Sequence, residues 1–182
     1  MSNLEDIFNY LVVFDSIILG LAASYLLDDI SKLIPKRNAI KFYWVHSIWI
    51  ALILLSVCQY WWGQLDDIQT VSEWRFWGFL INLIPLISLF IISDLAIPDI
   101  SEEVSEKLIS NGKIDFYKYY YIEFKKVVFP LFSSYLFFLI VQSILLEGKN
   151  FFHGINVFRC IGIGVFILLF YRNEEKIHSF FC

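Results

Sequence analysis

Five stretches of this 182-residue chain are long, apolar and nearly free of charged side chains. An α-helix needs about 20 such residues to cross the hydrocarbon core of a bilayer, and each stretch meets that length. They are residues 7–27, 42–62, 75–98, 127–147 and 151–171. The sequence therefore predicts an all-α fold, a polytopic integral membrane bundle of about five transmembrane helices that forms one domain over residues 1–182.

The composition supports this class of protein. Hydrophobic residues make up 58% of the chain, against about 45–50% in a typical soluble domain, and the mean hydropathy is +0.65. The charged residues cluster between the apolar stretches. These features exclude a soluble enzyme and a disordered acidic tail. The three cysteines lack the spacing of a metal or redox site, so a disulfide-stapled module is also excluded.

The distribution of basic residues predicts the orientation. Of the 14 lysines and arginines, 11 lie in the loop at 28–41, in the segment at 99–126 or in the C-terminal tail. Only Arg75 and Lys149 fall on the opposite side. Because basic loops stay in the cytoplasm, we expect the N-terminus outside and the C-terminus inside, in the inner (cytoplasmic) membrane of a bacterium.

The polar segment at 99–126 is predicted to carry a short cytoplasmic amphipathic helix. Asp99 is a candidate N-cap, and apolar residues then recur every four positions at Ile100, Val104 and Leu108. The turn signal Asn-Gly at 111–112 is expected to end this helix. A second helix is expected to begin at Asp115 and to continue into the fourth span.

Two opposite charges are predicted at one depth in the membrane. Asp15 and Arg159 each lie eight residues from the outer end of a span, roughly 12 Å deep, and Asn82 lies roughly 10 Å deep. An ionisable side chain at such a depth costs at least about 2.5–3.5 kcal/mol, so it is rare unless it is paired or functional. We expect Asp15 and Arg159 to pair, with Asn82 as a third contact. The pair would either fix helix packing or line an ion path.

A second polar pair is expected near the inner side. His46 and Asp94 each lie four residues from the cytoplasmic end of a span, roughly 6 Å deep. A carboxylate beside the imidazole would make it responsive to protons near neutral pH. The alternative is a structural role, because both residues lie close enough to the interface to meet water or lipid headgroups.

Aromatic and basic residues alternate before the fourth span, at Lys118, Tyr119, Tyr120, Lys125 and Lys126. Such a surface would bind a cytoplasmic protein or a nucleotide, with rings stacked on bases and lysines on phosphates. It would equally serve as an anchor in the headgroup region of the bilayer. No duplex nucleic acid is expected as a partner.

Intramembrane charge is the main functional signal, because it marks ion paths by default. We therefore expect a homo-oligomeric ion channel, pore or transporter, since five short helices are too few to enclose a broad pathway alone. The alternative is a membrane-embedded sensor or scaffold that binds a cytoplasmic partner through residues 99–126. The sequence lacks the HExxH, GxSxG, P-loop and EF-hand motifs. We expect no enzymatic activity, no cofactor and no metal site.

Overall fold

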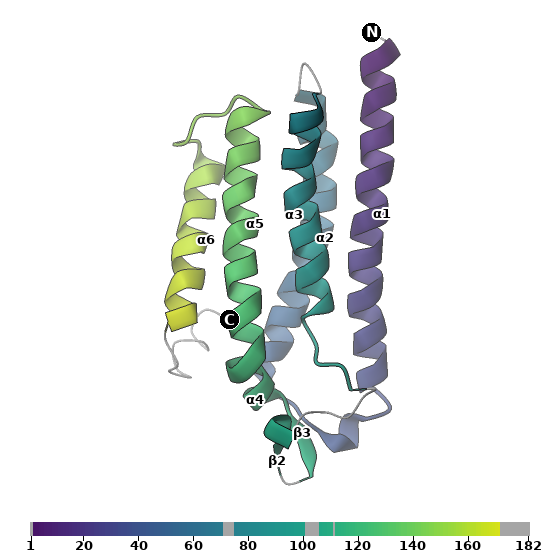
Figure 1. Cartoon of the computed structure of the whole chain (residues 1–182), viewed down its shortest axis with the longest axis vertical. Coiled ribbons are helices and arrows are strands. Elements are labelled where there is room, and N and C mark those ends of the chain that lie inside the picture. Colours follow the sequence, from purple (N-terminus) through teal and green to yellow (C-terminus); the bar gives the residue numbers. More distant parts are fainter. Residues whose placement is uncertain (1, 71–74, 101–105, 111, 172–182) are drawn as a thin grey trace.

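Five long helices run side by side along the molecule (Figure 1). The computed structural model describes residues 2–70, 75–100, 106–110 and 112–171. Within these residues, five segments are long and apolar enough to cross a membrane, as the sequence predicts. They are Asn9–Leu33, Trp44–Gly63, Phe76–Asp94, Phe116–Leu145 and Gly154–Tyr171. The long helices that contain them are α1 (Ser2–Leu33), α2 (Trp44–Thr70), α3 (Phe76–Asp94), α5 (Lys125–Leu145) and α6 (Gly154–Tyr171).

The helices follow a definite packing order. Helix α5 packs against α6 on one side and against α3 on the other, and α3 also packs against α1. Helix α2 contacts both α1 and α3. Figure 1 shows α1 and α6 on opposite sides of the bundle. Side chains on α1 therefore reach residues of α6 only through the helices between them.

Helix α1 continues beyond the end predicted from hydropathy. Lys32 lies 2.8 Å from the carboxylates of both Asp28 and Asp29, which precede it by four and three residues. Such pairs support a helix on its exposed side. The polar residues after position 27 therefore extend the helix to Leu33.

The fourth apolar helix begins before the predicted residue 127. Asp115 accepts a hydrogen bond from the Tyr117 backbone N–H at 3.0 Å and caps α4 (Phe116–Tyr119). A π-helical turn, η3 (Tyr120–Phe124), joins α4 to α5 without a break. The helix start expected at Asp115 is confirmed. The boundary at 127 is wrong, because the apolar helix already begins at Phe116. Four aromatic residues of α4 and η3 are buried at this end of the bundle: Phe116, Tyr119, Tyr120 and Phe124.

A small sheet closes one end of the bundle, which we call the sheet end; the other end is the far end. The strand order in this sheet is β1 (Ile40–Lys41), β3 (Lys113–Asp115) and β2 (Ile109–Ser110). Strand β1 is parallel to β3, and β2 is antiparallel to it. Lys41 forms an ion pair with Asp115 at 3.0 Å across β1 and β3. The sheet is an addition to the predicted all-α fold.

The described residues of the segment at 99–126 do not form the amphipathic helix predicted after Asp99. Residues 101–105 lie outside the described residues. The following residues form only the short 3-10 turn η2 (Glu106–Leu108) and then β2. A similar turn, η1 (Arg37–Ala39), precedes β1. Gly112 has a φ of +73°, which glycine adopts readily, so the turn expected at this position is confirmed.

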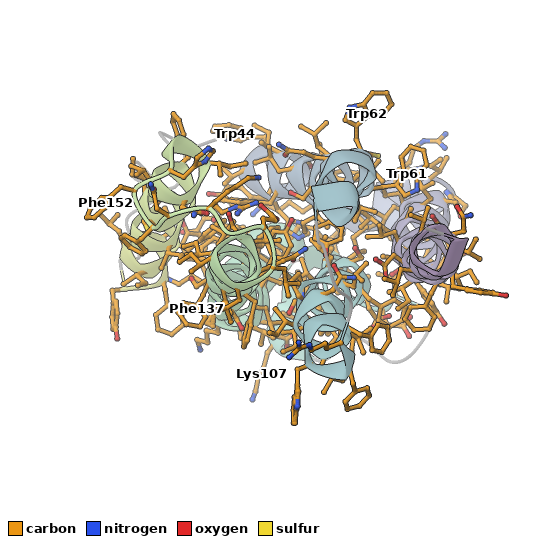
Figure 2. All side chains as sticks on the ribbon, turned by 90° about the horizontal axis from the view of Figure 1, so that it is seen from above. Trp44, Trp61, Trp62, Lys107, Phe137 and Phe152 are labelled. Carbon is orange, nitrogen blue, oxygen red and sulfur yellow. The ribbon has the colours of Figure 1, made fainter. Side chains whose placement is uncertain are left out.

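Large aromatic side chains surround the bundle. Figure 2 shows Trp62, Phe137 and Phe152 pointing away from the helices. Their exposed fractions are 70%, 53% and 83%. The interior is also aromatic, with Phe116, Tyr120, Phe124 and Phe129 among the largest fully buried side chains. Rings therefore fill the core and cover the perimeter.

Candidate functional site

Polar side chains from four helices meet at Asn82 of α3. The Asn82 side-chain amide donates a hydrogen bond to the carboxylate of Asp15, on α1, at 2.8 Å. Gln142 of α5 donates from Nε2 to Asn82 Oδ1 at 3.2 Å. The Tyr60 hydroxyl of α2 donates to the Asn82 backbone carbonyl at 3.4 Å. All four residues are buried, and we call them the polar row.

The chemistry of the polar row fixes the direction of each hydrogen bond. Asn82 turns its NH₂ group toward Asp15, whose Oδ2 accepts the hydrogen bond. Its carbonyl oxygen then faces Gln142, which must present its own NH₂ group. The Oε1 atom of Gln142 takes no part in these hydrogen bonds. It is buried and has no hydrogen-bond partner among the described residues.

The polar row borders a cavity of about 430 Å³ between α2, α5 and α6. Tyr60 and Gln142 lie in its wall. Aromatic and aliphatic side chains supply much of the remaining wall, including Tyr135, Phe158 and Leu139. The other polar side chains in the wall are Ser56, Gln59, Glu147 and Arg159. A largely apolar cavity with a few polar groups is typical of a small-molecule site.

Arg159 of α6 is held at the cavity wall by two hydrogen bonds. Its Nη1 donates to the Leu139 carbonyl of α5 at 2.9 Å and to Asn156 Oδ1 at 3.1 Å. Asn156 is buried and donates in turn to the Asn150 carbonyl at 3.1 Å. These contacts fix the guanidinium close to α5. In the described part of the chain, Arg159 forms no ion pair with a carboxylate.

The predicted pair of Asp15 and Arg159 is therefore wrong. The two residues lie on α1 and α6, on opposite sides of the bundle (Figure 1). The predicted contact between Asp15 and Asn82 is present. Matched depth placed the residues at one level, but depth alone does not show which helices are neighbours. Gln142 and Tyr60, which the sequence analysis did not select as site residues, connect Asn82 to the cavity.

An aromatic layer lies between the cavity and the sheet end. Phe132 and Phe166 stack with ring centroids 5.1 Å apart, and both lie in the cavity wall. Trp49 packs on Phe129 at 5.1 Å and on Phe166 at 5.6 Å. Trp49, Phe129 and Phe132 are buried. We call these four residues the aromatic layer; it forms the floor of the cavity.

His46 lies near the sheet end in a box of aromatic rings. The centroids of Phe124, Phe116 and Tyr119 are 4.9, 5.2 and 5.6 Å from the centre of the imidazole. Its Nε2 lies 2.8 Å from the Ala96 carbonyl. Because a carbonyl only accepts, Nε2 carries the proton. No partner for the buried Nδ1 was found within the described residues.

The predicted pair of His46 and Asp94 is also wrong. Asp94 is exposed at the end of α3 and is not a hydrogen-bond or ion-pair partner of His46. The Tyr119 hydroxyl donates to the Leu95 carbonyl at 2.9 Å. His46 and Tyr119 therefore bind consecutive carbonyls that follow α3. This arrangement supports a structural role, because carbonyls at the end of a helix lack partners within it.

The predicted binding surface before the fourth span is not formed as expected. Tyr119, Tyr120 and Lys125 are buried, so these two rings are not available to stack on a nucleotide. The rings of Tyr119 and Tyr120 pack instead against His46. Lys118 is partly exposed and donates to the Ile109 carbonyl at 2.7 Å. Lys126 is exposed.

No group of His, Cys, Asp and Glu that could hold a metal ion was found in the described ranges. Comparison of the chain with family models, with curated proteins and with solved structures gave no match.

Proposed function

We propose that this protein is an integral membrane transport protein, a channel, pore or transporter, whose path for a small polar solute runs through the single chain. The observation that carries the proposal is the cavity whose wall contains both Arg159 and Gln142. Buried polar groups inside a membrane bundle are costly and occur where solutes or ions pass. The polar row connects this cavity to Asp15, the carboxylate of α1.

The surface of the bundle supports its placement in a membrane. Trp62 and Phe152 are among many exposed aromatic side chains (Figure 2). In water, an exposed apolar surface of this extent promotes aggregation, whereas lipid solvates it. The sheet end carries the lysines Lys36, Lys41 and Lys113, so we place it in the cytoplasm and the far end outside. A bacterial cytoplasmic membrane fits this orientation.

The location of the polar groups favours a path within each chain over one shared between subunits. Asp15, Asn82 and Gln142 are buried inside the chain and do not face the lipid-exposed perimeter. A homo-oligomer remains part of the proposal, with a separate cavity in every subunit. Its interface would then be built from the apolar outer faces of the helices.

The aromatic layer is the closed gate in this proposal. Phe132 and Phe166 lie in the cavity wall toward the sheet end, and their rings stack with centroids 5.1 Å apart. A solute would enter the cavity from the far end. Opening of the gate toward the cytoplasm would follow from a change in the packing of α5 against α6. Motions of this kind set the rate of many transport and catalytic cycles.

Solute uptake into liposomes tests the proposal. Purified protein is reconstituted, and liposome swelling in small polar solutes is followed by light scattering. We expect faster swelling than in empty liposomes, and a further increase for Phe132→Ala, which removes one ring of the gate. Phe137→Ala is the matched control, because Phe137 lies on the same helix but is 53% exposed. Equal swelling rates with and without protein would contradict the proposal.

The alternative function, a sensor or scaffold that binds a partner through residues 99–126, has weaker support. Its recognition rings were expected at Tyr119 and Tyr120, and both are buried. Lys118 and Lys126 are still accessible at the sheet end. Because Tyr119 and Tyr120 are buried, these two lysines fit contact with anionic lipid better than recognition of a nucleotide.

A further inference from the structure

The guanidinium of Arg159 keeps one edge free at the cavity wall. Its two Nη1 protons go to the Leu139 carbonyl and to Asn156. The Nε and Nη2 atoms carry three more N–H groups, and none of them donates to a residue that the structure describes. Neither nitrogen is among the sealed, unpartnered atoms of the described chain, so both are accessible. Because Arg159 lies in the cavity wall, this edge is available to a ligand in the cavity.

The free edge has the geometry of an oxyanion site. In an arginine, Nε–H and one Nη2–H point in parallel from the same edge of the planar group. Such a fork binds two oxygens of one carboxylate or phosphate at once, and these bidentate pairs are among the strong hydrogen bonds of proteins. A halide ion offers only one atom to the fork. The two bonds of Nη1 hold the guanidinium of Arg159 in place before a ligand binds.

The charges in the wall favour an anion over a cation. Two of its described residues are charged, Arg159 and Glu147. The Glu147 carboxylate is paired with Lys149 at 2.6 Å, and its side chain is 3% exposed. Arg159 has no such partner in the described ranges and lies five residues after the start of α6, roughly 8 Å along the helix. A positive charge at that depth in a membrane bundle is costly without an anionic partner.

The Tyr135 hydroxyl is a further donor in the same wall. The Tyr135 ring packs against Tyr60 and Phe132, but its hydroxyl bonds to no residue that the structure describes and is not a sealed atom. The charge of Arg159 acts on this hydroxyl, so the two groups lie within electrostatic range of each other. Both groups have N–H or O–H protons to donate, and an anion accepts from both.

The remaining wall fits the apolar part of an organic molecule. Leu139, Ile155 and Phe158 line the cavity beside Arg159. Its volume of about 430 Å³ leaves space for more than an inorganic ion. Gln59 and Phe158 also belong to the wall and are exposed on the bundle, so the cavity is open to the surface. A few polar groups in an apolar wall are typical of a site for an organic ligand.

We infer that the cavity binds an organic oxyanion, a carboxylate or phosphate with an apolar part, whose oxygens accept from the free Nε and Nη2 edge of Arg159. This inference rests on the proposed function, because it names the solute class of the same cavity. Free organic acids and phosphate esters share this chemistry with the phosphate headgroup of lipids.

Calorimetric titration of the purified protein in micelles of an uncharged detergent tests the ligand class, with empty micelles as background. The probes are benzoate, phenyl phosphate and benzamide, which has the shape of benzoate without its charge. We expect at least one of the two oxyanions to bind, and benzamide to bind at least about tenfold more weakly, the loss expected for hydrogen bonds to a charged group. An equal concentration of chloride should not displace the oxyanion.

Three results would overturn the inference. They are the failure of both oxyanions to bind, equal binding of benzamide and the oxyanion, and displacement of the oxyanion by an equal concentration of chloride. All three are measured on the wild-type protein, so they do not depend on whether a variant folds.

Variants assign the binding to this cavity. Arg159→Gln should weaken oxyanion binding at least about tenfold. Arg159→Lys should give an intermediate affinity, because the charge stays while the fork is lost. Lys113→Gln removes a positive charge from an exposed strand position at the sheet end and should bind as wild type does. Thermal unfolding of each variant shows that it is folded. Unchanged binding by folded Arg159→Gln would overturn the assignment.

Phosphatidylglycerol nanodiscs distinguish a lipid headgroup from a free solute. If the headgroup occupies the cavity, the oxyanion that binds in uncharged detergent should no longer bind in the nanodiscs. If a free solute is the source, its binding should persist; either result supports the oxyanion class. Oxyanion binding without faster liposome swelling would contradict only the transport proposal. Faster swelling by a protein that binds neither oxyanion would contradict only this inference.

Discussion

The side-chain amide of Asn82 donates a hydrogen bond to the carboxylate of Asp15 at 2.8 Å, in the fully buried contact between α3 and α1. This bond joins the N-terminal helix to the helix at the centre of the polar row. Asn82 also accepts from Gln142. One asparagine therefore links α1 to the cavity wall through two hydrogen bonds.

Replacing Asn82 tests the polar row. Asn82→Leu should lower the free energy of unfolding by about 1–3 kcal/mol or more. The buried carboxyl group of Asp15 and the buried side-chain amide of Gln142 would each lose the hydrogen bond to Asn82. Thermal unfolding in detergent measures the change. The double variant Asp15→Leu with Asn82→Leu should regain part of the loss, since no buried carboxylate is left. Strictly additive losses in this cycle would show that the two residues are not coupled.

The hydroxyl of Tyr119 should contribute to stability at the sheet end. Tyr119→Phe removes its hydrogen bond to the Leu95 carbonyl and should cost about 0.5–1.5 kcal/mol. Tyr117→Phe is the matched control, because Tyr117 is 39% exposed on the same short helix. Thermal unfolding compares the two. Equal stability of both variants would mean that the bond does not support the end of α3.

Gly162 permits the close approach of α6 to α5 beside the cavity. A Cβ at this position would lie 2.8 Å from Leu136 Cδ1, whereas a Cβ at Gly164 would meet no atom within 4 Å. Gly162→Leu should therefore displace neighbouring side chains in the cavity wall and slow solute uptake into liposomes, while Gly164→Leu should leave uptake unchanged. Liposome swelling provides the comparison. Similar effects of the two changes would argue against the described packing of α5 and α6.

The proposed orientation gives a simple topological prediction. A reporter active only in the cytoplasm, fused after Cys182, should be active, because the basic residues cluster at the sheet end and in the C-terminal tail. The same reporter fused before Met1 should be inactive. The opposite pattern would reverse the membrane orientation and place the cavity on the cytoplasmic side.

Hydropathy was sufficient to predict the five long helices, because each apolar stretch exceeds the length needed to span a bilayer. The levels of Asp15 and Asn82 also followed from the sequence, since rise per residue is constant along a helix. The sequence did not predict which helices are neighbours in the bundle. Neighbouring helices are selected by side-chain packing, so the pairing of Asp15 with Arg159 was wrong.

Other parts of the site depend on burial that residue type alone does not reveal. Tyr119 and Tyr120 look like interface residues in the sequence, but their rings pack around His46. Asp94 ends α3 in an exposed position, which separates it from the imidazole. Gln142 gave a usable signal, because a side-chain amide within an apolar span is expected to find a polar partner.

The most direct test of the central claim is the uptake of small polar solutes into proteoliposomes by wild type and by Arg159→Gln. Liposome swelling measures the uptake, with Lys113→Gln, exposed at the sheet end, as the control for loss of one positive charge. We predict uptake by wild type and by the control, and at least about a tenfold lower rate for Arg159→Gln, because the cavity wall loses its guanidinium group. Equal uptake by wild type and Arg159→Gln would contradict a solute path through this cavity.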